Sequence, residues 1–156
     1  MLLVQKFSLN LNSHPSFLFG EITLDHTVVH FEIPANDPEK LSAFYKNLFG
    51  WTVDKTPMGG MGDYYLLRTR AGIGPEDMEK AQHTAGSDGG MMKRMNESQR
   101  PVNYIMVESV DDYAKKAEEL GGKIIVPKTP IPNMGAFAVA LDPEGNPFGV
   151  FESSGT

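Results

Sequence analysis

Apolar and polar positions alternate along residues 28–33. Phe31 and Ile33 share one side of the chain, and His30 and Glu32 share the other. A period of two residues is the pattern of a half-buried strand. It predicts that Phe31 and Ile33 face a core, whereas His30 and Glu32 point to the opposite side of a sheet.

A helix is predicted directly after this strand. Asp37 suits the N-cap, Pro38 suits the first helical position and Gly50 suits the end of the helix. Apolar residues recur between these ends at the spacing of one helix face. They are Leu41, Phe44, Tyr45 and Leu48. We expect this stripe, together with Phe49 and Trp51, to face the core.

Three more strands are predicted before the pattern repeats. Residues 51–55 are extended, and "YYLLRTR" (64–70) and "GGMMKRM" (89–95) have strand composition. Residues 72–90 are polar and rich in glycine. We interpret them as a long loop that carries a short helical piece near residues 77–82.

The second half of the chain repeats this series of elements. A strand in "PVNYIMV" (101–107) leads to a helix that Ser109 caps and Gly121 ends. Three strands follow, in "KIIVPKTPI", "AFAVALD" and "FGVFE". Aligning the two halves places Asn103 where the first half has His30, and it turns Tyr104 toward the second helix.

The repeat predicts an α+β fold of two tandem βαβββ modules, at residues 27–95 and 101–152, which together form one domain. Each amphipathic helix covers one face of its own sheet. The opposite faces of the two curved sheets are therefore expected to enclose a pocket, lined by the residues whose strand parity is opposite to the helix-facing ones.

Composition narrows the classes of function. The 156 residues carry a formal net charge of −6, which repels nucleic-acid phosphates. There is no cysteine, so any metal would need His, Asp or Glu ligands. No apolar run is long enough to cross a membrane, and residues 1–26 lack the features of a signal peptide. We expect a cytoplasmic protein in which residues 1–26 form an ordered N-terminal extension.

The chain resembles the vicinal oxygen chelate superfamily, which contains glyoxalase I, bleomycin-resistance proteins and extradiol dioxygenases. The resemblance spans residues 27–152. It rests on "HFEIPANDPEKLSAFYKNLFGW" (30–51), on "VNYIMVESVDDYAKKAEELGG" (102–122) and on the ending "DPEGNPFGVFE" (142–152). Because this fold hosts several chemistries as well as proteins that only bind ligands, the resemblance implies the fold but not one activity.

The resemblance also implies a metal site built from the first and last strands of each module. Carried over by position, the ligand places fall on His30, near Met92, on Asn103 and on Gly149. Only His30 keeps a ligand type, because Met92 is a soft thioether, Asn103 is a weak donor and Gly149 has no side chain. Glu32 is a neighbour on the same face, but two ligands hold a metal weakly. We therefore assign no metal cofactor, and a divalent ion at His30 stays the alternative.

Three roles are open to His30. It is a pocket histidine hydrogen-bonded to Asn103 or Tyr65, or a metal ligand, or a general base whose tautomer is set by Glu32. The first role is favoured, because a lone histidine lacks a ligand set. The predicted ligand pocket is lined by His30, Glu32, Tyr65, Met92, Asn103, Phe137, Gly149 and Phe151.

Two functions are consistent with these observations. The first is a glyoxalase- and bleomycin-resistance-like protein that holds a small organic ligand in a cavity without a complete metal site. The alternative is a metal-dependent, glyoxalase-like lyase or isomerase that acts on a carbonyl substrate with vicinal oxygens. In both cases the expected partner is a small molecule rather than a nucleic acid or a membrane. A homodimer is expected, because two-fold dimers are the commonest oligomers.

Overall fold

The computed structural model describes residues 25–58, 62–70 and 86–154, and both predicted modules are present in them. The first module consists of β1 (Val28–Ala35), α1 (Pro38–Phe49), β2 (Thr52–Pro57), β3 (Asp63–Arg68) and β4 (Gly89–Lys93). The second consists of β5 (Val102–Met106), α3 (Val110–Glu119), β6 (Lys123–Ile131), β7 (Gly135–Leu141) and β8 (Pro147–Ser153).

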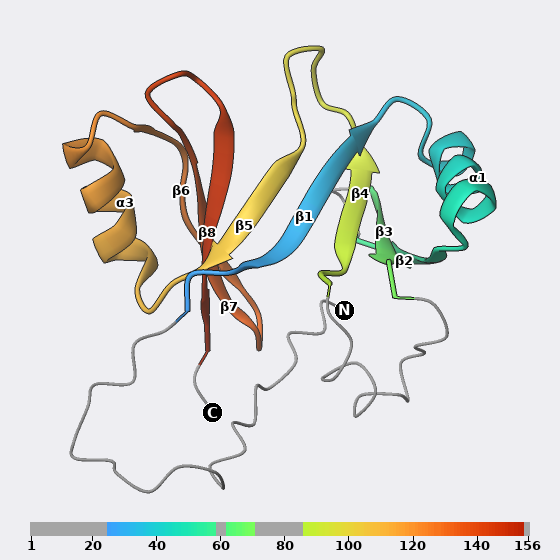
Figure 1. Cartoon of the computed structure of the whole chain (residues 1–156), viewed down its shortest axis with the longest axis horizontal. Helices are drawn as coiled ribbons and strands as arrows, with labels where there is room; N and C mark the ends of the chain where they lie inside the picture. Colours follow the sequence, from blue (N-terminus) through green and yellow to red (C-terminus); the bar gives the residue numbers. More distant parts are fainter. Residues whose placement is uncertain (1–24, 59–61, 71–85, 155–156) are drawn as a thin grey trace, which may run out of the picture.

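The strands form one eight-stranded sheet in the order β2-β3-β4-β1-β5-β8-β7-β6. Each module contributes four neighbouring strands, and the modules meet at the centre, where β1 pairs antiparallel with β5. Figure 1 shows these two central strands side by side, with one module on each side of them. The predicted α+β fold of two tandem βαβββ modules is therefore confirmed, as one curved, open sheet with two helices.

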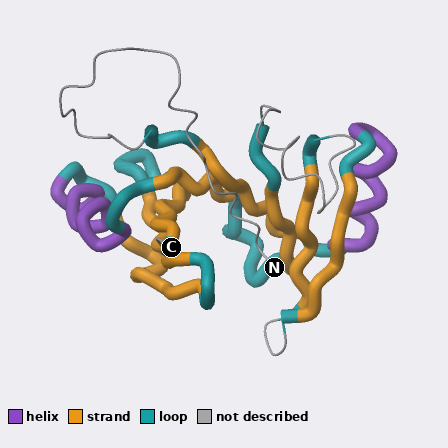
Figure 2. The backbone as a smooth tube through the Cα atoms, turned by 90° about the horizontal axis from the view of Figure 1, so that it is seen from below, coloured by secondary structure: helices purple, strands orange, loops and turns teal. Residues whose placement is uncertain are grey.

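Both helices cover the same face of the sheet, and the core lies beneath them in two clusters. The cluster on the α1 side contains Ala35, Tyr65, Leu67 and Met91. The cluster on the α3 side contains Val107, Val110, Ala138 and Val150. Figure 2 shows the sheet curving between the two helices, which lie at its opposite ends. We call the helix-covered face the outer face and the opposite, concave face the inner face.

The helix ends follow the predicted capping chemistry. The Asp37 side chain accepts a hydrogen bond from the backbone N–H of Lys40 at 3.0 Å, and Gly50 ends α1 with a φ of 72°. Ser109 accepts from the backbone N–H of Asp112 at 3.2 Å at the start of α3. These caps fix where each strand passes into its helix, and so they fix which strand residues face the helix.

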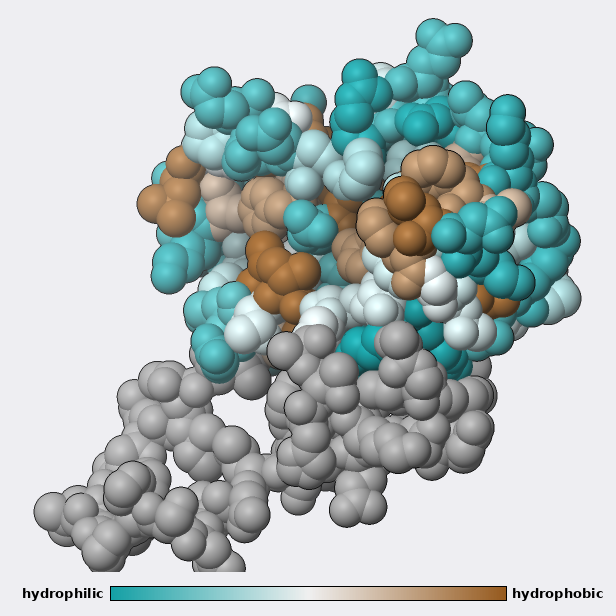
Figure 3. All heavy atoms as spheres, turned by 45° about the vertical axis from the view of Figure 1, so that its right-hand side comes forward, coloured by the Kyte–Doolittle hydropathy of each residue, from teal (hydrophilic) through white to brown (hydrophobic). Residues whose placement is uncertain are grey.

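The predicted burial of the α1 stripe is only partly right. Three of the residues expected in the core are largely exposed: Phe44 (54%), Leu48 (56%) and Phe49 (56%). The buried side of α1 is centred instead on the small residue Ser42, whose hydroxyl donates to the carbonyl of Pro38. Tyr45 stacks on Trp51 at the edge of this side, with ring centroids 4.9 Å apart. Figure 3 shows the resulting apolar patch over α1.

Two predicted features lie largely outside the described residues. They are the N-terminal extension at residues 1–26, of which residues 25–26 are described, and the loop at residues 72–90, of which residues 86–90 are described. In the described ranges, no helix is both long and apolar enough to span a membrane.

Candidate ligand-binding site

The inner face gathers polar side chains where β1 and β5 pair. His30 lies directly opposite Tyr104, and Glu32 lies two residues further along β1. Residues that are paired across neighbouring strands point to the same face. The residue of β5 that shares the inner face with His30 is therefore Tyr104.

Two residues predicted to line the pocket lie on the outer face instead. Asn103 pairs with Phe31, on the helix side of the sheet, and is exposed. Tyr65 is buried in the α1 cluster, where its hydroxyl donates to Glu39 at 2.9 Å. The predicted hydrogen bond from His30 to Asn103 or Tyr65 is therefore wrong. The reason is strand parity, since a shift of one residue sends a side chain to the other face.

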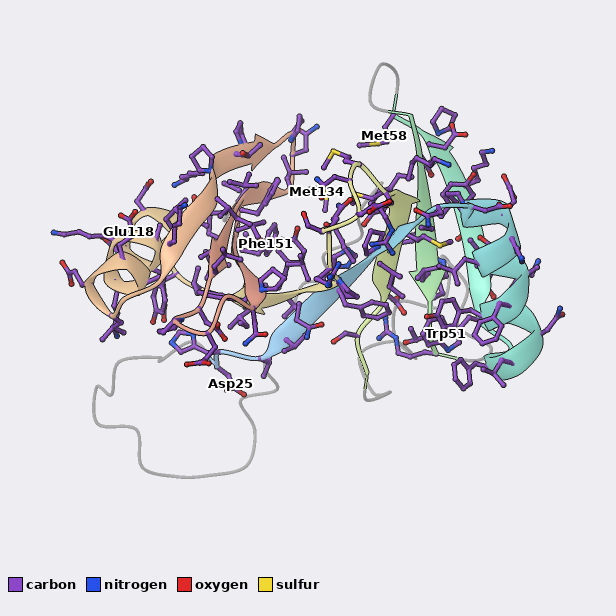
Figure 4. All side chains as sticks on the ribbon, turned by 90° about the horizontal axis from the view of Figure 1, so that it is seen from above. Asp25, Trp51, Met58, Glu118, Met134 and Phe151 are labelled. Atoms are coloured by element: carbon purple, nitrogen blue, oxygen red, sulfur yellow. The ribbon has the colours of Figure 1, made fainter. Side chains whose placement is uncertain are left out.

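The other predicted residues share the inner face. Register pairs place them there: His30, Glu32, Met92, Phe137, Gly149 and Phe151. The ring of Tyr104 meets the ring of Phe137 edge to face, with centroids 6.0 Å apart. Figure 4 shows Phe151 on the inner side of the sheet and Trp51 beside α1. The contact of these inner-face residues with a ligand stays a prediction.

Four hydrogen-bonded side chains form the polar centre of the inner face, and we call them the inner-face tetrad: His30, Glu32, Tyr64 and Tyr104. The hydroxyl oxygen of Tyr64 lies 2.9 Å from Nε2 of His30. The hydroxyl of Tyr104 donates to Oε2 of Glu32 at 2.8 Å. Tyr64 also lies close enough to Glu32 for each group to shift the pKa of the other. The tetrad thus consists of two neighbouring hydrogen-bonded pairs, drawn from β1, β3 and β5.

Two glycines provide the space that the tyrosine rings occupy. A Cβ atom on Gly90 would lie 1.7 Å from the hydroxyl oxygen of Tyr64, and a Cβ atom on Gly149 would lie 2.2 Å from Cδ1 of Tyr104. A glycine inside a strand often marks such a close approach by another group. The space above Gly149 is therefore filled by Tyr104, and no side chain from β8 could extend there without moving that ring.

Burial keeps His30 in its neutral form. It lowers the pKa of the imidazole from 6.5 to about 4, against smaller raising effects from a hydrogen bond to the backbone of Asp88 and from the Asp88 carboxylate. At neutral pH the ring is therefore uncharged, and one of its nitrogens can accept a hydrogen bond. The tautomer decides whether Nε2 accepts from Tyr64 or donates to it.

Burial also raises the pKa of Glu32, and the nearby hydroxyls of Tyr104 and Tyr64 offset part of that rise. The pKa of each tyrosine is raised far above its usual range by burial and by the nearby charge of Glu32. Both phenols are therefore protonated at neutral pH. The tetrad presents two neutral phenols, a neutral imidazole and one carboxyl group on a concave, largely apolar face.

The described residues do not fit the metal site that the resemblance implies. Asn103 points to the other face, Tyr104 fills the space above Gly149, and Met92 offers only a thioether. His30 and Glu32 are engaged with tyrosines. Among the described residues, no group of three or more His, Asp or Glu side chains is arranged to hold an ion. A divalent metal normally needs about that many matched ligands.

The two tyrosines of the tetrad were missed in the sequence. The pair "YY" gave no indication of which tyrosine faces inward, and the alignment of the two halves turned Tyr104 toward the helix. The available signal was the pair Gly90 and Gly149, because each lies inside a strand, where a glycine often marks a close approach by another group. A large partner side chain over each glycine would have explained both.

The sequence matches the family model described as Glyoxalase/Bleomycin resistance protein/Dioxygenase superfamily over residues 24–150. CFP32 of Mycobacterium tuberculosis, which carries a provisional glyoxylase name, is 28% identical over 123 residues that cover 79% of this chain and 44% of CFP32. The anthracycline biosynthesis protein DnrV of Streptomyces peucetius is 25% identical over 125 residues, covering 78% of this chain and 45% of DnrV. The chain thus spans about half the length of these relatives.

The fold is also that of known structures. Methylmalonyl-CoA epimerase from Mycobacterium tuberculosis superimposes with a TM-score of 0.57 at 12% sequence identity, covering 86% of this chain and 95% of the epimerase. A likeness at this level of identity concerns the arrangement of the elements, and activity depends on the residues of each site.

Proposed function

Because the chain belongs to the glyoxalase/bleomycin resistance protein/dioxygenase superfamily, we propose that it binds a small organic molecule on the inner face of its sheet. The inner-face tetrad anchors the polar groups of this ligand. Phe137 and Phe151 contact its apolar part, as expected for a site that is mostly apolar with a few placed polar groups. The observation that carries the proposal is the tetrad, in which partly buried titratable groups bind one another on a concave face.

A purely structural role explains the tetrad less well. Burial disfavours the charged forms of both His30 and Glu32, which is a cost that apolar residues at these positions would avoid. Each of the tetrad's tyrosines also requires a glycine on a neighbouring strand. Groups with such perturbed pKa values are concentrated at functional sites. This favours a binding site over a core that happens to contain polar residues.

The alternative function, a metal-dependent lyase or isomerase, has less support. Its chemistry needs an ion that binds vicinal oxygens of the substrate, and the described donors on the inner face do not fit one. The glyoxylase name belongs to CFP32, of which this chain covers 44%. We therefore propose binding without a metal and derive no catalytic step.

Ligand mapping by NMR tests the proposal. A set of planar carbonyl, phenol and amine fragments is titrated into protein labelled with ¹⁵N and with ¹³C in its methionine methyl groups. We expect saturable shifts at Met92 and at the backbone of Phe137 and Phe151. Tyr104→Phe removes the hydroxyl that holds the carboxylate of Glu32 in position, so the best fragment should bind roughly tenfold more weakly. Shifts confined to the outer face, or no saturable binding, would contradict the proposal.

A tyrosine outside the tetrad provides a matched control for this experiment. Tyr113 lies on α3 at the outer face, and its hydroxyl is bonded to His26. The variant Tyr113→Phe removes the same atom from the other side of the sheet. It should leave fragment affinity unchanged.

A further inference from the structure

We propose that the ligand of the inner face is an organic cation, with its positive group against the carboxylate of Glu32 and its apolar body against Tyr104 and Phe137. This inference rests on the proposed function and adds the chemical class of the ligand. It follows from the surroundings of Glu32, from the pairing of the nearby basic residues and from the aromatic wall beside the carboxylate.

Within residues 25–58, 62–70 and 86–154, the groups that contact Glu32 are neutral. Its carboxylate accepts a hydrogen bond from Tyr104 at 2.8 Å, and the hydroxyl of Tyr64 lies nearby. In the described parts of the chain, the ion pairs of lysine and arginine side chains go to carboxylates other than Glu32. Among the described residues, Glu32 is therefore a partly buried acid that no positive side chain neutralises.

The arginines at or beyond the ends of β3 and β4 illustrate this pairing. Arg68 binds Asp54 through its Nε at 2.8 Å, and Arg70 binds Asp88 at 2.6 Å. Arg94, beyond β4, donates to the backbone carbonyls of Pro34 and Gln99. Each of these cations already has an acceptor elsewhere. Because none of these described cations is directed at Glu32, we expect a positive group that reaches it to come from the ligand.

A protonated amine would supply the positive charge and the N–H donors that Glu32 lacks among the described residues. A carboxylate has about four acceptor positions, and the hydroxyl of Tyr104 occupies one of them. A partly buried negative charge is costly without a partner, and a cation that binds there removes this cost while it donates its N–H groups. An anionic ligand would meet the same carboxylate with repulsion. Glu32 is partly exposed, so a ligand can reach it.

The aromatic residues beside Glu32 fit the same class of ligand. The ring of Tyr104, which binds Glu32, lies edge to face with Phe137, and Phe137 is paired with Phe151 on the next strand. Ring faces attract ammonium groups and also bury apolar surface. The formal net charge of −6 raises the local concentration of cations around the whole chain.

A matched pair of probes tests the inference. Naphthylmethylamine and naphthalenemethanol share a ring system and differ in the charge of one group. Their dissociation constants for the full chain are measured by NMR titration, with the inner-face signals as the readout. We expect the amine to bind roughly tenfold more tightly than the alcohol, because its N–H groups add hydrogen bonds to a charged acceptor. This comparison uses the wild-type protein and does not depend on the folding of a variant.

Two variants assign the preference to one carboxylate. Glu32→Gln keeps an oxygen that can accept from Tyr104 but removes the charge, and it should abolish the preference for the amine. Glu118→Gln removes one charge from the exposed surface of α3 and should leave the preference unchanged.

The outcomes separate the two proposals. Equal binding of the two probes to the inner face would overturn the cation inference and leave the proposed function intact. An amine preference that survives in Glu32→Gln would also overturn the inference. Failure of both probes to bind the inner face would contradict both proposals.

Discussion

Replacing Gly149 by alanine is expected to lower the free energy of unfolding by about 2–3 kcal/mol. The added methyl group would lie 2.2 Å from Cδ1 and 2.8 Å from Cγ of Tyr104. Because Cγ is at the root of the side chain, rotation of the ring cannot clear this contact. Tyr104 is only 7% exposed, so it has little free space to move into. The backbone of β5 or β8 would have to shift, and the hydrogen bond to Glu32 would be strained.

A double-mutant cycle checks the cause of this loss. Urea unfolding is measured for Gly149→Ala, Tyr104→Ala and the double variant. If the ring fills the space above Gly149, the cost of the added methyl group should fall below about 1 kcal/mol once the ring is removed. Losses that simply add would show that Gly149 is required for another reason.

Acid is expected to destabilise the protein through His30 by about 3 kcal/mol. The pKa of His30 is about 4 in the folded state, against 6.5 for an unperturbed histidine. Below pH 6.5 the unfolded chain takes up a proton that the folded protein does not accept. The contribution of neutral His30 to the free energy of unfolding is therefore fully present above pH 6.5. It is lost progressively as the pH falls to about 4.

Glu32 changes the stability with pH in the opposite direction, and its effect must be separated from that of His30. Its raised pKa means that the folded protein takes up this proton more readily than the unfolded chain, which adds stability as the pH falls. Urea unfolding of wild type and of His30→Gln across this pH range isolates the histidine, because both proteins retain Glu32. The difference between the two stability curves should shrink toward acid. Parallel curves would contradict a buried, neutral His30.

The helix starts and the repeat were readable in the sequence because each rests on local chemistry. Asp37 and Ser109 cap their helices as predicted, through hydrogen bonds that span only three residues. The two βαβββ modules follow from the same order of patterns in each half. These features need no knowledge of distant contacts.

The inner-face residue of β5 was mistaken because the two halves were aligned from the starts of their strands. Counting back from the helix caps gives the observed result: Glu32 and Tyr104 each precede their N-cap residue, Asp37 or Ser109, by five positions. A strand that enters its helix in the same way in both modules keeps its parity relative to the cap. The alternation breaks between Val28 and His30, where the register of β1 shifts, and therefore the strand start is a poor reference.

The spacing of apolar residues along α1 does not predict which of them are exposed. The positions of Phe44 and Leu48 fit one helix face, but the side that packs on the sheet is centred on Ser42. Which side of a helix is buried depends on the partner surface, and a small residue allows closer approach than an aromatic one. That partner surface is assembled from strands distant in the sequence.

Metal content measures the central claim most directly, namely that a hydrogen-bonded tetrad occupies the place of a metal centre. The full chain is equilibrated with Zn²⁺, Mn²⁺, Ni²⁺ or Fe²⁺, dialysed without chelator and analysed for bound metal, in parallel with His30→Ala. We predict far less than one ion per chain, with no difference between the two proteins. One ion per chain in the wild type, lost in His30→Ala, would contradict the account.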